Sequence, residues 1–427
     1  MPPQRERRGT VQNASAMESA AHFLAGKKVI IAGGGISGLS FAAALQKLWP
    51  ASLDRPKVVI YERDTRDDAE GREGYSISIA GHDDTGGLYA LNQLGLLDKA
   101  LEHAVLGLEP DSRFKCWDSS WKELISVRFK PARGLPTSGI RIGRRNLRKV
   151  LIDATADEIT WDSACTAARL LDNGKVSVTV VKGDAEFEDE CDLLISADGA
   201  NSRIRRCLRP DDNLRYAGAV QLGGLAHFDK IPEPVERHWG LIITGKGVTC
   251  FFSPVDKNNL VWGLSRLEKD PRPPLDKSDN EALQAIIEES RQIGHMIAEP
   301  FPTIVDATPL DEVFAFPARD KEAFRHDAST GPVVFIGDAN HAVSPFAGYG
   351  ASLALKDGWD LAEQICQSGS LAAALKTYDD ISVPRARKIL NTSRGRISTG
   401  HCTGLRYYFY RCLFTVGGFI LWLTGQN

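Results

Sequence analysis

The 427-residue chain lacks the features that mark several large classes of protein. It has no basic excess, because 52 Lys and Arg residues are balanced by 55 Asp and Glu residues, so a nucleic-acid partner is disfavoured. Its eight cysteines are scattered without a CxxC pair, which argues against a disulfide framework or a zinc site and favours free thiols in a reducing compartment. The sequence also shows no repeat, no Ser-His-Asp arrangement and no metal-ligand spacing, so we expect no metal site.

Both ends of the chain lack a clear targeting signal. Residues 1–26 are polar and have no apolar core, so they are not a secretory signal and are predicted to be a disordered extension. A mitochondrial transit peptide is the alternative, against which Glu6 and Glu18 count. The apolar run at 407–423 is split by Arg411 and falls short of the ~20 residues of a spanning helix. It is predicted to pack on the body or on a second subunit, with contact with a membrane surface as the alternative. A cytoplasmic location follows, with membrane association left open.

A β-α-β unit opens the folded part of the chain. Residues 28–32 form an apolar, β-branched run, 36–48 have helical spacing, and 58–61 form a second short strand. Between the first strand and the helix lies a GxGxxG fingerprint formed by Gly33, Gly35 and Gly38. Gly33 allows a tight turn, Gly35 leaves room for a pyrophosphate, and Gly38 lets the helix lie close to the strand. Glu62 ends the second strand, where its carboxylate suits ribose hydroxyls, and Arg63 beside it joins the predicted cofactor contacts.

The remaining pattern predicts an α/β fold, α+β overall. It consists of a discontinuous Rossmann-like domain, an interleaved and mostly antiparallel β domain, and a C-terminal helical segment. The first domain is expected over 27–110, 140–210 and 330–370, the second over 111–139 and 211–329, and the C-terminal helices with the apolar tail over 371–427. The aromatic and β-branched stretch 216–266 is the expected antiparallel sheet.

Two later segments carry further chemistry. Asp198-Gly199 follows a buried strand at 192–197 and is read either as a cofactor contact or as an Asx-type helix cap. Gly337-Asp338 ends the strand at 332–337, where a carboxylate can accept a hydrogen bond from a cofactor hydroxyl. A glycine-rich loop then leads into a helix whose N-terminus can stabilise negative charge on a flat ring. The loop residues assigned to the cofactor are Pro345, Gly348, Gly350 and Ala351.

In these segments the chain resembles the FAD-dependent aromatic hydroxylases, or group A flavin monooxygenases, including tetracycline-inactivating and fungal secondary-metabolite enzymes. Asp198, Ser202 and Arg205 fall on that family's DGxxSxxR segment. The resemblance also assigns Arg144 to a position near the flavin, with Arg145 as a competitor, and matches Gly74 to a glycine near the ring. The chain departs from the family at four positions, namely Tyr349 for Gln or Glu, Ser352 for Asn, Lys356 for an acid and Gly358 for Ala.

The resemblance implies an FAD enzyme that NAD(P)H reduces transiently, since the sequence shows no second GxGxxG. It further implies a C4a-hydroperoxyflavin that hydroxylates or epoxidises a hydrophobic aromatic, polyketide or indole-type molecule, in secondary metabolism or xenobiotic oxidation. His238 and Tyr349 are the candidate catalytic side chains, although His238 is also read as a loop histidine. Tyr75, Trp239 and Phe346 are candidate pocket walls. A flavin reductase or dehydrogenase without oxygen insertion, a flavin-binding sensor and an NAD-dependent dehydrogenase are the alternatives.

Overall fold

The computed structural model describes residues 22–67 and 75–423. Gly74 and most of the predicted N-terminal extension lie outside these residues. Residues 22–26, which the sequence assigned to that extension, pack against the body. Leu24 is buried, and His22 donates a hydrogen bond from Nε2 to the carbonyl of Ile365 over 2.9 Å.

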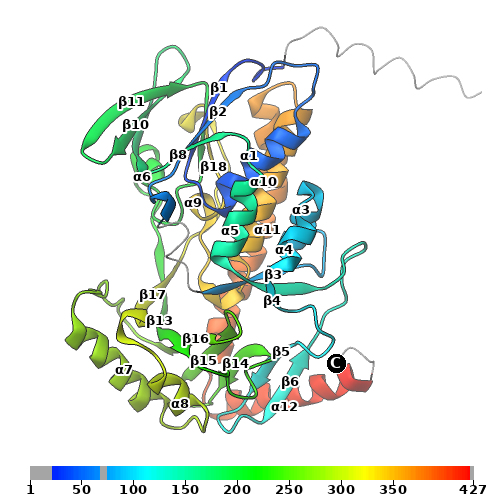
Figure 1. Ribbon diagram of the computed structural model, residues 1–427, viewed down its shortest axis with the longest axis vertical. Helices are drawn as coiled ribbons and strands as arrows, with labels where there is room; N and C mark the ends of the chain where they lie inside the picture. The colour runs from blue at the N-terminus through cyan, green and yellow to red at the C-terminus, as the bar shows by residue number, and fades with distance from the viewer. Residues whose placement is uncertain (1–21, 68–74, 424–427) are drawn as a thin grey trace, which may run out of the picture.

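A five-stranded parallel sheet lies at one end of the molecule (Figure 1). Its strands, in spatial order, are β18 (Val333–Phe335), β12 (Leu193–Ser196), β1 (Lys28–Ala32), β2 (Lys57–Tyr61) and β8 (Glu158–Thr160). Side chains alternate across the sheet, so Val29 and Ile31 face the helices while Ile30 faces the opposite layer. Because both faces are buried, these strands are apolar throughout instead of alternating with polar residues.

Helices cover one face of this sheet and a small sheet covers the other. The helical layer contains α1 (Ile36–Leu48), α3 (Gly87–Leu94), α4 (Leu97–Glu102), α5 (Arg144–Asp153) and α10 (Gly350–Gln367). The opposite layer is the antiparallel sheet of β9 (Ser163–Leu170), β10 (Val176–Lys182) and β11 (Ala185–Cys191), with α6 (Arg203–Leu208) beside it.

A seven-stranded mixed sheet lies at the other end of the molecule (Figure 1). Its spatial order is β17 (Phe314–Asp320), β13 (Arg215–His227), β16 (Asn259–Leu267), β15 (Val248–Pro254), β14 (Trp239–Ile243), β5 (Phe114–Trp117) and β6 (Glu123–Val127). Helices α7 (Asn280–Gly294) and α8 (Phe301–Asp306) bury one face of it. Between the two large sheets lies a third, of β3 (Ser76–Ala80), β7 (Gly139–Gly143) and β4 (Ala104–Leu106).

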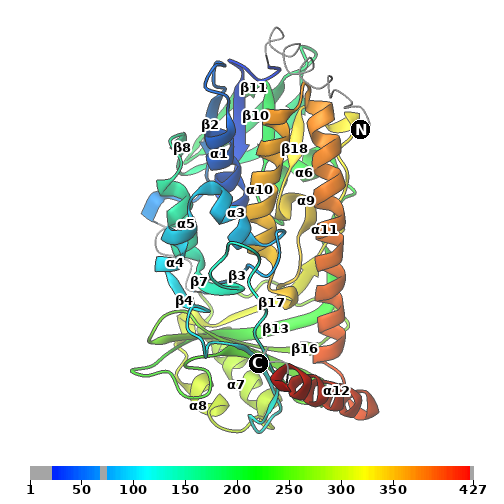
Figure 2. The same cartoon turned by 90° about the vertical axis from the view of Figure 1, so that its right-hand side faces the viewer.

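Two helices end the described chain. α11 (Leu371–Gly400) lies in the predicted C-terminal helical segment and runs along the height of the molecule past both large sheets (Figure 2). Pro384 lies inside it without ending it. The apolar tail forms α12 (Gly404–Leu423), which packs on β6. Within the described residues, no helix is long and apolar enough to cross a membrane. The predicted fold class is confirmed, whereas the predicted domain limits stay predictions.

Candidate functional site

Four of the predicted segments meet at one edge of the parallel sheet. Gly33 follows β1, Glu62 follows β2, Asp198 lies two residues beyond β12, and Gly337 lies two residues beyond β18. All these strands run in the same direction, so the four positions lie together at the carboxyl ends. β1 sits between β2 on one side and β12 on the other, which is the switch point where open α/β sheets bind their ligands. We call the segments 33–38, 62–64, 144–148 and 337–351 the cofactor cradle.

The glycine turn after β1 has the geometry that a pyrophosphate requires. Gly33 has a φ of +109°, and a Cβ there would lie 2.5 Å from the carbonyl oxygen of Ala197. A Cβ on Gly38 would lie 2.2 Å from the carbonyl oxygen of Gly33, so the helix and the turn touch. A Cβ on Gly35, in contrast, would meet open space. The first turn of α1 carries no acidic residue and Gly35 gives no side-chain cap, so its N–H groups point to a space that suits an anion.

Glu62 and Arg148 hold the glycine turn in place through their contacts with Gly34. Glu62 accepts a hydrogen bond from the N–H of Gly34 over 2.7 Å through Oε2. Arg148 lies 3.1 Å from the same carboxylate oxygen and donates from Nε to the carbonyl of Gly34 over 2.9 Å. Both side chains are buried, and Asp64 provides a second carboxylate 3.3 Å from Arg148. Sequence reasoning missed Arg148, although it follows Arg144 by one helical turn and therefore lies on the same face.

Arg144 connects the two sides of the cradle. Burial and the neighbouring Arg148 lower the pKa of Arg144, while the carboxylates of Asp338, Asp64 and Glu62 act in the opposite direction. One guanidinium is therefore within electrostatic reach of the acids that follow β2 and β18. Glu62 and Asp338 therefore lie on the same side of the molecule, at the carboxyl ends of β2 and β18.

Asp338 is surrounded by protein but still reached by solvent. Burial raises the pKa of its carboxyl group, yet the residue remains exposed. Tyr75 shows the same combination, because it is 46% exposed while burial and Asp338 raise its pKa. A charged group and an aromatic ring that lie deep but remain accessible are expected where the protein leaves space for a ligand.

Asp198 and Arg205 make hydrogen bonds that position the backbone next to the cradle. The Asp198 carboxylate accepts hydrogen bonds from Ser196 Oγ at 2.7 Å and from the N–H of Arg203 at 2.8 Å, whereas the side chain that caps α6 is Ser202. Arg205 donates to the carbonyl of Ala339 over 2.7 Å and to that of Ala200, so it joins the turn after β12 to α9 (Asp338–His341). Through these hydrogen bonds the DGxxSxxR segment positions α9, the helix that begins at Asp338.

A buried charge network anchors Gly337 and Asp338. Asp357 accepts a hydrogen bond from the N–H of Gly337 over 2.9 Å, and its other oxygen lies 3.0 Å from Arg385. His341 Nε2 lies 2.6 Å from the same carboxylate. Burial disfavours the charge on His341, but Asp357 outweighs it and raises the pKa of His341 above its usual value. Burial likewise opposes the charge of Asp357, while His341 and Arg385 hold its pKa below the ordinary range.

The glycine-rich loop places Tyr349 beside a histidine that the sequence did not single out. Pro345–Ala347 forms a 3-10 turn, Gly348 takes the left-handed conformation with a φ of +64°, and Gly350 begins α10. Tyr349 Oη lies 2.7 Å from His82 Nε2, and the same nitrogen lies 3.4 Å from Asp83. Burial, followed by Asp83, raises the pKa of Tyr349, so its hydroxyl keeps its proton at neutral pH.

The loop lies against the seven-stranded sheet on the face opposite α7 and α8, which we call the inner face. Phe346 packs with Ala219 of β13 there. Gln221 of the same strand lies on this face, because it alternates with Val220 and Leu222, which pack toward α7. Among the described residues, Gln221 Oε1 is buried without a hydrogen-bond partner. An orphaned buried acceptor of this kind suits a ligand that offers a hydroxyl or N–H donor.

Arg141 is a second polar group between the loop and the inner face. It is 4% exposed and donates hydrogen bonds to Ser78 of β3, which contacts the Gly348 position, and to Ser253 of β15. Its guanidinium also lies over the ring of Phe251, 5.4 Å from the centroid. No carboxylate among residues 22–67 and 75–423 pairs with it, and burial lowers its pKa to about 9. Sequence reasoning also missed Arg141, whose only signal is an arginine in an apolar strand.

The side chains of the other predicted residues do not contribute contacts to the cradle. Arg63 is largely exposed and contacts its neighbour Asp64 at 3.8 Å. His238 lies beside β5, where burial and Lys115 lower its pKa to about 4, so it is a poor base at neutral pH. Trp239 stacks edge-on against Phe114 at the same place.

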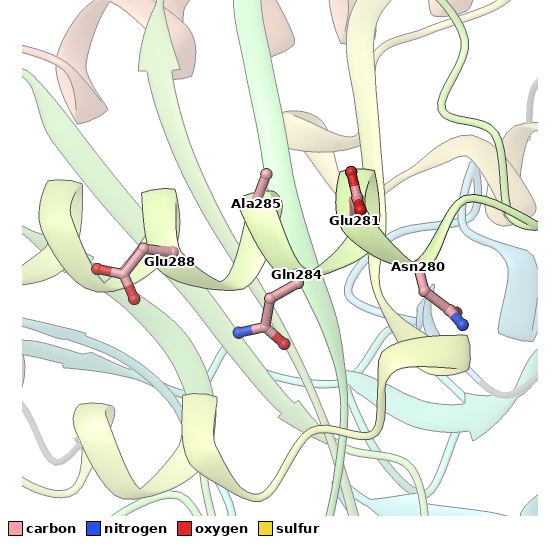
Figure 3. A pocket seen from close by; sticks show the side chains of 5 residues that line it. All are labelled: Asn280, Glu281, Gln284, Ala285 and Glu288. Atoms are coloured by element: carbon pink, nitrogen blue, oxygen red, sulfur yellow. The ribbon is translucent and has the colours of Figure 1, made fainter.

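A surface hollow elsewhere is formed by a single helix (Figure 3). Five side chains at one-turn spacing along α7 line it, namely Asn280, Glu281, Gln284, Ala285 and Glu288. They come from one exposed helix face and do not converge, so this hollow does not offer a second site.

Comparisons with known proteins agree with this geometry. The FAD binding domain family model matches residues 27–393. Monooxygenase cfoF of Aspergillus candidus is 41% identical over 392 residues, which cover 90% of this chain and 94% of that relative. The fold also matches HpxO of Klebsiella pneumoniae complexed with FAD and uric acid, at a TM-score of 0.72, 22% identity, and 92% and 94% coverage of the two chains. Tetracycline destructase Tet(55) matches at a TM-score of 0.67 and 18% identity, over 93% of this chain and 96% of that one.

Proposed function

The chain belongs to the FAD binding domain family and is an FAD-dependent monooxygenase, and from that premise we propose that it uses NAD(P)H and O2 to hydroxylate or epoxidise a hydrophobic ring compound that carries a hydroxyl or N–H group. The observation that carries the proposal is the juxtaposition of the cofactor cradle with the inner face, where Phe346 of the loop packs on Ala219 of β13. For hydroxylation the balance is substrate C–H, O2, NAD(P)H and a proton giving C–OH, NAD(P)+ and water.

The cradle fits FAD from end to end. We assign the pyrophosphate to the open N-terminus of α1 at Gly35, the ribose to Glu62, and the ribityl chain to Asp338. The ring edge is assigned to the loop of Pro345, Gly348, Gly350 and Ala351, at the N-terminus of α10. Bound FAD supplies the redox and oxygen chemistry, while Arg144 balances charge along the cradle and the surrounding layers exclude water.

The inner face supports the substrate class. Phe251 and Phe346 provide apolar surface, and Gln221 Oε1 is an acceptor that only a donor group can satisfy. Arg141 adds a buried positive charge that favours a phenol or enol whose oxygen can carry negative charge. These features fit hydroxylated aromatic, polyketide and indole-type rings and disfavour simple alkanes.

Tyr349 and His82 are proposed to handle the substrate proton. As the substrate hydroxyl loses its proton to Tyr349 Oη, the phenol proton of Tyr349 moves to His82 Nε2 over the 2.7 Å contact. His82 can then release that proton beside Asp83. Deprotonation makes an aromatic ring more electron-rich, which assists transfer of an oxygen atom to it. This step uses Tyr349, which the sequence predicted, and does not use His238.

Labelled oxygen separates the proposal from its alternative. The purified protein, supplied with NAD(P)H and a panel of phenols, indoles and polyketides, is expected to oxidise the nicotinamide faster with its substrate and to incorporate one atom of labelled O2 into product. Product that forms without label identifies a reductase or dehydrogenase of the same fold. Tyr349→Phe should then lower kcat at least about tenfold and shift its pH profile, with little change in KM.

A further inference from the structure

Helix α12 exposes an unusually apolar face. Half of the large hydrophobic side chains that are exposed among the described residues belong to this one helix. Leu405 is 89% exposed and Phe409 65% exposed, and the face continues through Leu413, Ile420 and Leu423. Spacings of three and four residues place these side chains on one side, where a helix on a soluble surface normally carries polar groups.

The opposite side of α12 holds the helix on the body. Tyr407 and Phe414 pack with Cys116 of β5 and Ile243 of β14. Gly418 approaches the backbone of β6, because a Cβ there would lie 3.4 Å from the carbonyl oxygen of Leu124. The exposure of this face is therefore not a result of α12 being unpacked, because the opposite side of the helix contacts the body. It is a separate face, fixed in direction, at one end of the molecule (Figure 2).

The charged side chains on the helix itself are of one sign. Residues 404–423 include no Asp or Glu, and the exposed Arg406 lies in the first turn. Lys246, also exposed, forms a β-bridge with Thr403 next to that turn. Arg411, further along, is a partly exposed side chain that lies 3.4 Å from Asp118. An apolar ridge with cations at its margin complements a surface that combines hydrocarbon with negative charge.

The charges favour a lipid surface over a second copy of the chain. Twenty residues give an apolar ridge about 30 Å long. In a twofold dimer each copy would present the same patch, so the cations at its margin, Arg406 and Lys246, would meet no acidic residue of the other copy's α12. Since no described helix can cross a membrane, the helix would lie along the surface. We propose that α12 docks the enzyme on an anionic lipid bilayer, with its exposed face in the headgroup layer.

Vesicle flotation tests the proposal on the full chain. The native protein is expected to float with vesicles of phosphatidylcholine and phosphatidylserine, and to float less with phosphatidylcholine alone or at high salt. The double variant Phe409→Glu/Leu413→Glu should bind the mixed vesicles at least about tenfold more weakly, because two exposed anchors become acidic. The matched control Leu267→Glu/Ile381→Glu makes the same change at two exposed positions on β16 and α11 and should float like the native protein.

Each result decides the matter. Both double variants should retain flavin, since none of the four residues lies in the cofactor cradle. Retained flavin shows that a loss of flotation does not come from unfolding of the enzyme. Native protein that stays unbound with both kinds of vesicle overturns the proposal. So does a dimer, detected by light scattering, that Phe409→Glu/Leu413→Glu dissociates, because it assigns the face to a second copy. Equal binding to neutral and anionic vesicles contradicts the proposed preference for an anionic lipid surface.

Discussion

The cofactor cradle and the inner face of the seven-stranded sheet are built in different ways. In the cradle, most positions are set by the backbone, because Gly33 and Gly38 touch other chain segments and Gly35 borders open space. On the inner face, the distinguishing groups are side chains such as Arg141 and Gln221, placed among apolar neighbours. Binding a pyrophosphate and a flat ring demands a particular backbone path, whereas choosing among ring substrates demands particular side chains. Substitutions in the cradle should therefore lower stability or FAD binding. Substitutions on the inner face should instead change how the enzyme handles its substrate.

The largest effect is expected from the buried ion cluster of the cradle. Arg148→Met removes the cation that lies 3.1 Å from Glu62 and 3.3 Å from Asp64, and Glu62 is buried, so we expect a loss of about 3–5 kcal/mol in the free energy of unfolding. Urea denaturation measures this loss. Arg169→Met is the control, because it breaks an exposed pair with Glu188 and should leave the free energy of unfolding nearly unchanged. Equal losses in the two variants would mean that Arg148 has no special role in the turn.

Two glycine substitutions separate folding from flavin binding in the cradle. Gly38→Val forces a Cβ to 2.2 Å from the carbonyl of Gly33, so we expect about 3 kcal/mol of destabilisation together with loss of flavin. Gly35→Ala meets no atom within 4 Å, so its thermal midpoint should match that of the native apoprotein while its FAD affinity falls. Calorimetry and flavin absorbance measure the two quantities. An alanine at 35 that retains native FAD affinity would place the pyrophosphate elsewhere.

An intermediate effect, on catalysis alone, is expected at the inner face. Gln221→Leu removes the unpartnered acceptor without a large change in volume, so the unfolding free energy should change by less than about 1 kcal/mol. The KM for the hydroxylated substrate should rise about tenfold, because the substrate donor loses its partner. Steady-state kinetics check this expectation, with FAD content as the control. An unchanged KM alongside reduced stability would assign Gln221 to the sheet instead of the substrate.

The same contrast explains what the sequence could predict. Strand, turn, helix and acid recur at short spacing along the chain, so the glycine fingerprint, Glu62 and Gly337-Asp338 were visible as local patterns and the fold class followed from them. Arg148 and His82 became apparent only when segments distant in sequence met, since their partners are Gly34, 114 residues away, and Tyr349, 267 residues away. Asp198 bonds to neighbours within six residues, whereas the side chain that caps α6 is Ser202, and a cofactor contact of Asp198 stays a prediction. His238 was chosen for its residue type, which carries no information about what surrounds it.

The smallest effects are expected from two histidines, His341 in the cradle and His238 beside β5. Burial and Lys115 lower the pKa of His238 to about 4, below its value of ~6.5 in the unfolded chain, so the unfolded state binds the extra proton. Its contribution to stability is present above pH ~6.5 and is lost as the pH falls toward 4. His341 behaves in the opposite way, because Asp357 outweighs burial and raises its pKa. Its contribution is present below pH ~6.5 and is lost as the pH rises through the raised value.

Urea denaturation across pH can resolve these opposite slopes. His238→Gln should flatten the acid side of the stability profile by on the order of 1 kcal/mol, a figure that allows for the partial exposure of this histidine. His341→Gln should lower stability overall, because Asp357 loses a partner, and should flatten the alkaline side. The slopes are the decisive readout, since a general loss of packing shifts the whole profile without changing its shape. A His341→Gln profile parallel to that of the native protein would show that folding does not shift the pKa of this histidine, and would contradict its stabilisation by Asp357.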